Sequence, residues 1–125
     1  MARSVTDIGR SGEFLAAYIL ETHGVEVHHV DRAGADLWCR IPSGLVTVQV
    51  KSSSAPRLSN AKASSLRYPF HTRSIDADWV CFVALDRELL LLRPVSEVLA
   101  STTWISTVEY NEVNQRRTID RMLGG

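Results

Sequence analysis

The chain has 125 residues, of which 45% are hydrophobic and 22% charged, and its 14 basic and 14 acidic side chains balance to zero net charge. This composition is typical of a folded soluble domain and excludes collagen-like, coiled-coil and disordered chains. The apolar runs at 14–20, 79–85 and 89–92 are all shorter than the roughly 20 residues that a membrane-spanning helix requires.

The length of the chain and its first ten residues predict the number of domains and the cellular compartment. A chain of this size suits one domain, so we expect a single domain over 1–125 with its core at about 9–100. The first ten residues carry no apolar stretch of the kind found in secretory signals. We therefore expect a cytoplasmic protein with no membrane partner.

The first predicted element is a helix over 11–24. Ser11 is its expected N-cap, an apolar stripe follows at helical spacing, and Gly24 ends it. Period-two alternation then predicts an antiparallel meander, because two stretches with turn residues separate three short runs. These runs are 25–30, 35–40 and 45–51.

The second half of the chain predicts a connection followed by more strands. The stretch 52–78 is rich in serine and basic residues, and we expect a short helix within it at about 59–67. The elements expected after it are a buried strand at 79–85, a strand at 89–93, a short helix at 94–100, a strand at 103–108 and a polar helical tail. The predicted fold class is therefore a mixed α+β sheet with flanking helices.

Charge is distributed unevenly along this neutral chain. No Asp or Glu occurs between Leu37 and Ile75, and six basic residues fall in that segment. Such a segment can present a positive surface to phosphate groups, or it can be an ordinary solvated face. The basic residues after the third strand are Arg57, Lys62, Arg67 and Arg73.

The two cysteines, Cys39 and Cys81, lie in apolar surroundings. We expect buried thiols rather than a disulfide. The four histidines show no zinc-like spacing with them, which argues against a zinc site.

The strand at 45–51 carries two different rows of side chains. Val46, Val48 and Val50 share one face, and Thr47, Gln49 and Lys51 share the other. Burying a lysine costs several kcal/mol unless it is paired or has a function. Asp36 on the preceding strand is the nearest counter-charge, since a turn near 42–44 places 36–38 across from 49–51. A cross-strand ion pair on the surface is the simplest alternative.

These residues resemble the core of the PD-(D/E)XK nuclease superfamily. The resemblance rests on Glu13 in "GEFLAAYIL", Asp36 in "AGADLW" and the tripeptide 49–51 in "VQVKSSS", and it covers about residues 9–98. The Gln-x-Lys tripeptide is similar to that of group I intron homing endonucleases. Ala35 stands where the superfamily pattern has proline. The resemblance implies a restriction-endonuclease-like core and a metal-dependent endonuclease that hydrolyses phosphodiester bonds in DNA.

The resemblance also implies a role for each residue. Glu13, Asp36, Gln49 and Lys51 would be catalytic. Mg²⁺, with Mn²⁺ as an alternative, would be bound by Asp36, the Gln49 side-chain oxygen and the Val50 carbonyl, and by Glu13 through water or a second ion. Lys51 would orient the attacking water or neutralise charge on the phosphorane. The residues that would contact DNA are Ser52, Ser53, Arg57, Lys62, Arg67 and Arg73.

Several alternatives stay open at this point. Gln49 replaces the usual carboxylate, which favours a catalytically silent DNA-binding or assembly subunit of the same fold. A structural ion-pair domain with no nucleic-acid role is the other rival. The DNA would be duplex or branched, with homing or restriction-type cleavage competing with Holliday-junction resolution. We expect a homo-oligomer, either a dimer or a tetramer, and residues 101–125, with Arg116, Arg117 and Arg121, would serve as an oligomerisation or DNA-contact tail.

Overall fold

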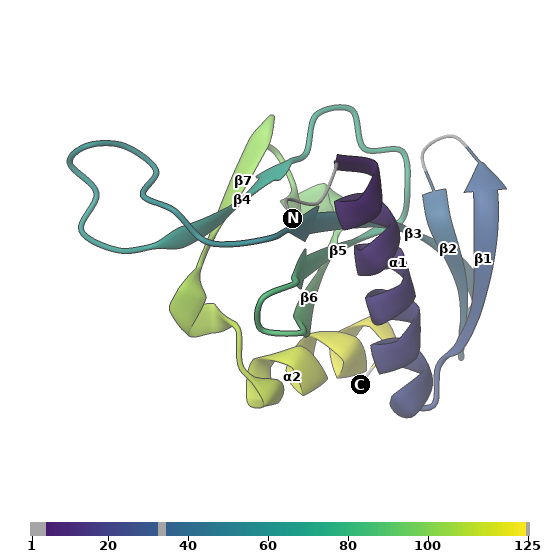
Figure 1. The fold of residues 1–125 in the computed structure, drawn as a ribbon. Coiled ribbons are helices and arrows are strands. Elements are labelled where there is room, and N and C mark those ends of the chain that lie inside the picture. The colour runs from purple at the N-terminus through teal and green to yellow at the C-terminus, as the bar shows by residue number, and fades with distance from the viewer. Residues whose placement is uncertain (1–4, 33–34, 125) are drawn as a thin grey trace.

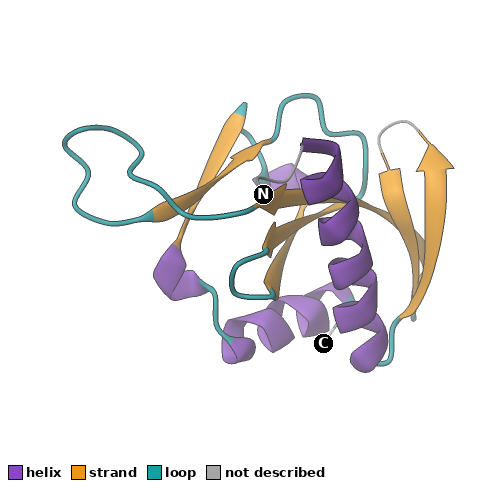
Figure 2. Ribbon diagram, viewed as in Figure 1, coloured by secondary structure: helices purple, strands orange, loops and turns teal. Residues whose placement is uncertain are grey.

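The structure is a computed structural model that describes residues 5–32 and 35–124. A five-stranded mixed sheet has helices on one face and a two-stranded ribbon on the other (Figures 1 and 2). The strand order in this main sheet is β1-β2-β3-β5-β6, with only β3 and β5 parallel. These strands are β1 (Glu26–Arg32), β2 (Ala35–Ile41), β3 (Gly44–Ser53), β5 (Trp79–Ala84) and β6 (Leu89–Pro94).

One face of the main sheet packs on the two helices, α1 (Val5–Thr22) and α2 (Glu112–Met122). Side chains of both helices join a single apolar cluster with alternate residues of the strands, including Leu37, Val48 and Cys81. This burial stabilises the helices because each buries an apolar stripe against the sheet. Cys39 and Cys81 are free, buried thiols in this cluster, as the sequence predicts.

The opposite face is partly covered by the ribbon of β4 (Arg67–His71) and β7 (Thr102–Ser106), which pair antiparallel. Tyr68 and Phe70 of β4 pack on Val80 and Phe82 of β5 in a second apolar cluster. The ribbon packs on β5 and β6 through this cluster, and β4 also contacts β3. The mixed α+β class predicted from the sequence is confirmed.

Two predicted elements in the first half differ from the structure. Helix α1 includes Ser11 in its interior rather than at its N-cap, because the helix continues towards the N-terminus past that residue. The helix predicted at 59–67 is absent, and this stretch is an irregular loop leading into β4. Its serine-rich sequence has no apolar stripe to bury, so tertiary packing does not stabilise a helix here. The turn predicted after residue 30 includes residues 33 and 34, which lie outside the described residues.

The C-terminal part also differs in detail. The helix predicted at 94–100 is a single 3-10 turn at Val95–Glu97, and a second such turn, Thr107–Glu109, follows β7. The side chain of Asn111 caps α2 by accepting a 2.8 Å hydrogen bond from the Asn114 N–H. Ile105 and Ile119 are fully buried. The core therefore extends beyond the boundary near residue 100 that the sequence predicts.

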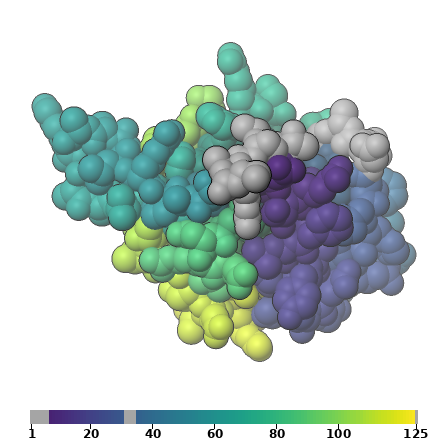
Figure 3. Space-filling model, viewed as in Figure 1, coloured from purple at the N-terminus to yellow at the C-terminus, as the bar shows by residue number. Residues whose placement is uncertain are grey.

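The segment 54–66 between β3 and β4, which we name the arm, projects from the body of the protein (Figures 1 and 3). Most of its residues are exposed. Within the described part of the chain, no helix combines the length and apolarity needed to cross a membrane.

Candidate active site

The site predicted from the sequence lies where β2 and β3 separate. Their antiparallel pairing runs from Ile41 opposite Gly44 to Leu37 opposite Val48, and β3 continues beyond this point to Ser53. The register is two residues away from the predicted one, since Trp38 lies opposite Thr47 rather than Gln49. A shift of two residues keeps every side chain on its predicted face.

Asp36 holds the two strands together at the point of separation. Its Oδ2 atom accepts a 2.8 Å hydrogen bond from the Val50 N–H, so a carboxylate takes the place of a backbone acceptor. In a strand the N–H and C=O groups of one residue point to the same side. The Val50 carbonyl is therefore directed towards the Asp36 side of β3.

Gln49 and Lys51 lie on the same face as Asp36. In the parallel pairing with β5 they lie opposite Val80 and Phe82, which belong to the ribbon-side cluster. Asp36 alternates with Leu37, which packs on the helix side. The three side chains are half-buried and lie on one face of two neighbouring strands, beside the C-terminal half of β3. The structure thus brings together the three residues that the strand pattern singles out.

Helix α1 approaches the same end of β3 from the other face. A Cβ atom at Gly12 would lie 1.7 Å from the Ser52 Oγ and 2.9 Å from its Cβ, so only glycine fits here. Glu13 follows Gly12 and lines a cavity of about 470 Å³ with residues of α1 and β1: Arg10, Phe14, His29 and Val30. Glu13 thus lies on the helix side of the sheet, whereas Asp36, Gln49 and Lys51 lie on the ribbon side.

The two serines after Lys51 point to different surroundings. The Ser52 Oγ is buried and has no hydrogen-bond partner among the described residues, because it packs under Gly12. The Ser53 hydroxyl donates a 3.3 Å hydrogen bond to the Ala55 carbonyl at the start of the arm. Neither hydroxyl is presented to solvent as an open phosphate contact.

The predicted DNA-contact cations lie on and beside the arm. Arg57, Lys62 and Arg67 are exposed along it and at its junction with β4, and Arg73 is exposed in the loop after β4. The Arg57 guanidinium lies over the Trp104 ring of β7, 5.5 Å from its centroid. No acidic residue occurs in this part of the sequence.

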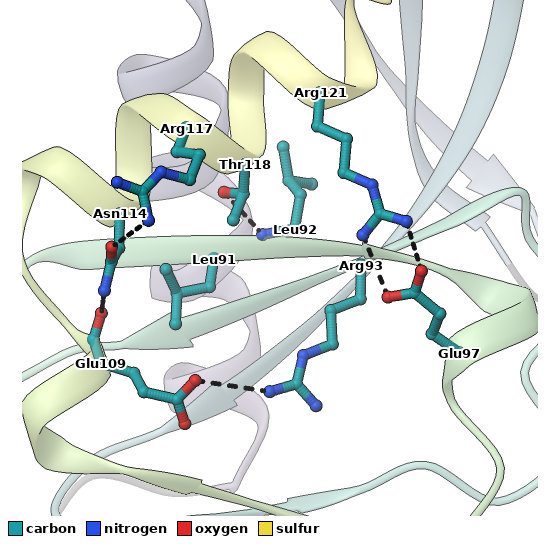
Figure 4. Close-up of a pocket in the computed structure, with 9 residues that line it drawn as sticks. All are labelled: Leu91, Leu92, Arg93, Glu97, Glu109, Asn114, Arg117, Thr118 and Arg121. Atoms are coloured by element: carbon teal, nitrogen blue, oxygen red, sulfur yellow. Dashed lines mark hydrogen bonds and ion pairs between the residues drawn. The ribbon is translucent and has the colours of Figure 1, made fainter.

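A second pocket, of about 280 Å³, lies between β6 and α2 (Figure 4). Its three arginines have nearby partners: Arg93 is 4.0 Å from Glu109, Arg121 pairs with Glu97, and Arg117 contacts the Asn114 amide oxygen. Because two carboxylates face these guanidinium groups, the pocket has little net charge to offer an anion. The separation of β2 and β3 is therefore the better candidate for chemistry.

The donor set at this separation consists of oxygen atoms. Asp36 supplies a carboxylate, Gln49 an amide oxygen and Val50 a backbone carbonyl. Hard divalent cations such as Mg²⁺ prefer oxygen ligands and retain several waters, so the type of donor fits this ion. Within residues 5–32 and 35–124 there is no group of three or more His, Cys, Asp or Glu that could hold a metal.

Gly12 is not predicted from the sequence, and Trp104 is predicted only as part of the oligomerisation or DNA-contact tail at 101–125. Gly12 is required by the close approach of α1 to β3, and a glycine inside a helical pattern is a recognisable signal of such packing. Trp104 supports Arg57 from a strand that is distant in sequence. No local pattern indicates that pairing.

Comparison with known proteins supports the fold. No protein-family model and no curated protein matches the sequence. Among solved structures, the chain is similar to a bacterial homing endonuclease, I-Ssp6803I. The match has a TM-score of 0.64 and 24% sequence identity, and it covers 81% of this chain and 74% of that chain. This likeness shows that the two chains share a fold.

Proposed function

We propose that the protein is a metal-dependent endodeoxyribonuclease of the PD-(D/E)XK superfamily that hydrolyses phosphodiester bonds in DNA with Mg²⁺ or Mn²⁺. The observation that carries this proposal is the position of Asp36, bonded to the Val50 N–H where β2 and β3 separate, on the same face as Gln49 and Lys51. The fold shared with a homing endonuclease supports it.

Each residue has a role in this proposal. Asp36, the Gln49 side-chain oxygen and the Val50 carbonyl would hold the ion, which when bound supplies positive charge to the phosphate and the attacking water. Lys51, two residues along the same face, orients that water or neutralises charge that develops on the phosphorane. Glu13 approaches from α1, and its contribution would pass through water or a second ion.

The proposed substrate is duplex or branched DNA. Arg57, Lys62, Arg67 and Arg73 form the basic surface that contacts it. Homing or restriction-type cleavage and Holliday-junction resolution are both compatible with this surface. A small domain that cuts both strands needs two sites, so we expect a dimer or a tetramer in the cytoplasm.

A second candidate function is a catalytically silent DNA-binding or assembly subunit. The observation that favours it is Gln49, because an amide oxygen carries only a dipole where a carboxylate carries a charge. Replacing Gln49 by Glu restores that charge. Under the nuclease proposal the wild type already cuts DNA, whereas a silent subunit cuts only after this replacement or not at all.

The test is a cleavage assay on supercoiled plasmid and on a synthetic four-way junction, with Mg²⁺ or with EDTA. The variant Asp36→Asn is informative because asparagine keeps an oxygen that can accept from the Val50 N–H but removes the negative charge. Asp120→Asn, on the exposed surface of α2, is the matched control. The wild type and the control should cut with Mg²⁺, and Asp36→Asn should not.

Gel-shift measurements on the same samples separate the alternatives. Binding without cutting by the wild type, together with cutting by Gln49→Glu, would identify the silent subunit. If the protein neither binds nor cuts either the plasmid or the four-way junction, the nucleic-acid function is overturned altogether.

A further inference from the structure

The β4–β7 ribbon has one face on the core and one face open. On β4, Tyr68 and Phe70 are buried, and the alternate residues point away from the main sheet. Strand pairing places their partners on β7 on the same outer face. This outer face consists of Arg67, Pro69, His71, Thr102, Trp104 and Ser106.

Arg57 of the arm extends this outer face. Its backbone exchanges two hydrogen bonds with Arg67, of 2.9 and 3.0 Å, so the two arginines lie directly opposite each other as a hydrogen-bonded antiparallel pair. Like charges in directly opposite positions destabilise a sheet. A function that needs two adjacent guanidinium groups would account for this arrangement.

Trp104 fixes the orientation of one member of the pair. The Arg57 guanidinium lies 5.5 Å from the centroid of its ring, a cation–π distance. Such support reduces the conformational entropy that the arginine loses when it binds a ligand. It also holds the guanidinium group on the outer face rather than folded back on the arm.

The charge and shape of the outer face fit one kind of partner. No acidic residue occurs between Leu37 and Ile75, and β7 carries no charge, so positive charge is not compensated along the ribbon by its own strands. The major groove of B-DNA, about 12 Å wide, admits a two-stranded β-ribbon. An arginine side chain matches the O6 and N7 acceptors of guanine with two parallel hydrogen bonds.

We propose that the outer face of the β4–β7 ribbon enters the major groove of duplex DNA, where Arg57 and Arg67 read the edges of bases. Lys62 at the tip of the arm and Arg73 after β4 contact phosphates. This inference rests on the proposed function and deepens it, because it assigns sequence recognition to one element. It separates the residues that position the DNA from those that specify its sequence.

The test uses the conservative variants Arg57→Lys and Arg67→Lys. Lysine keeps the charge and hence the contribution to phosphate attraction, but it loses the planar pair of donors. Wild type and variants are incubated with a randomised duplex library, and the bound fraction is sequenced. Affinity for a fixed duplex is measured at several salt concentrations. Arg40→Lys is the matched control, since Arg40 is exposed, pairs with Glu26 and lies at the far end of β2 from Asp36.

The wild type and Arg40→Lys should enrich the same sequence. Each ribbon variant should lose about 10- to 100-fold of its preference for guanine at particular positions, with an unchanged slope of log affinity against log salt. Lys62→Ala should instead weaken binding to all sequences and reduce that slope by about 1. Circular dichroism and thermal unfolding confirm that the variants are folded.

The outcomes separate this inference from the function on which it rests. If the wild type binds without sequence preference, or if both ribbon variants enrich the wild-type sequence unchanged, base reading by the ribbon is overturned while DNA binding stands. If the wild type binds the four-way junction but no duplex in the library, only the inference is overturned. If it binds neither DNA, the proposed function fails together with the inference.

Discussion

The two rows of side chains on β3 have different surroundings. Val46, Val48 and Val50 face α1 and form part of an apolar cluster. Gln49 and Lys51 face the other way, on the same side as Asp36, and lie opposite Val80 and Phe82 of β5. One strand therefore serves both the core and the proposed chemistry, because alternation separates the two functions by a single residue.

Substitutions in the two rows should therefore have different consequences. Changes on the helix side should reduce stability, and changes on the polar side should reduce activity. Stability and activity should both change only where the backbone or a close packing contact links the two rows.

Lys51→Met should reduce DNA cleavage by about 10²- to 10³-fold, the usual loss when a charged group that stabilises the transition state is removed. Methionine keeps the length of the side chain, so the denaturant midpoint should stay within the range of neutral substitutions. Single-turnover cleavage and urea unfolding check the two expectations. A large loss of stability with full activity would assign Lys51 to the structure alone.

Val48→Ala is the matched change in the other row. Val48 is fully buried, so removing two methyl groups should lower the free energy of unfolding by about 1.5–3 kcal/mol. Cleavage below the unfolding temperature should change little. Urea unfolding measures the first effect. A folded variant that has lost cleavage would contradict the separation of the two rows.

Gly12→Ala tests the contact between α1 and the end of β3. Alanine favours a helix, but its Cβ would overlap Ser52, and overpacking of this kind costs about 1–3 kcal/mol. The contact lies one residue beyond Lys51, so cleavage should also fall. Unfolding and cleavage are both measured on the same preparation.

Ser52→Gly should rescue the Gly12→Ala variant, because it removes the Ser52 Oγ and Cβ atoms that the new Cβ would overlap. The double variant should recover stability relative to Gly12→Ala alone, and a double-mutant cycle gives the coupling. Without such recovery, the close approach of these two residues would not be the cause of the loss.

The smallest expected effect concerns Tyr68, which is buried in the ribbon-side apolar cluster. Burial and the hydrogen bond from the Tyr68 hydroxyl to Asp86 raise the pKa of Tyr68 to about 12. The folded protein therefore holds this proton more tightly than the unfolded chain, whose tyrosine pKa is about 10. The stabilisation is fully present below pH about 10 and is lost as the pH rises through about 12.

Tyr68→Phe should make the alkaline loss of stability shallower, measured as urea midpoints between pH 8 and pH 11. It should not abolish the loss, because burial also raises the pKa of Tyr110 and of the two cysteine thiols. Asp86 is exposed, so the variant leaves no buried carboxylate behind. An unchanged pH profile would show that Tyr68 does not contribute to it.

The sequence by itself determined the elements of the main sheet and the division of β3 into two rows. Alternation is a local property, so Val48 and Lys51 could be assigned to opposite faces without any tertiary knowledge. The buried state of the cysteines and the mixed fold class followed from the same apolar patterns. The pairing of Asp36 with this strand was predicted within two residues, because the turn at 42–44 restricts the hairpin.

Tertiary structure decided what the sequence could not. The arm was predicted to contain a helix, and it has none because no core lies beside it to bury an apolar stripe. The pairing of β4 with β7 joins residues that are about 35 positions apart along the chain, and no local pattern encodes such a contact. That pairing places Trp104 beneath Arg57 and creates the outer face of the ribbon. Gly12 and Ser52 likewise meet only when α1 packs on β3, because their close approach is a property of two surfaces and not of either segment alone.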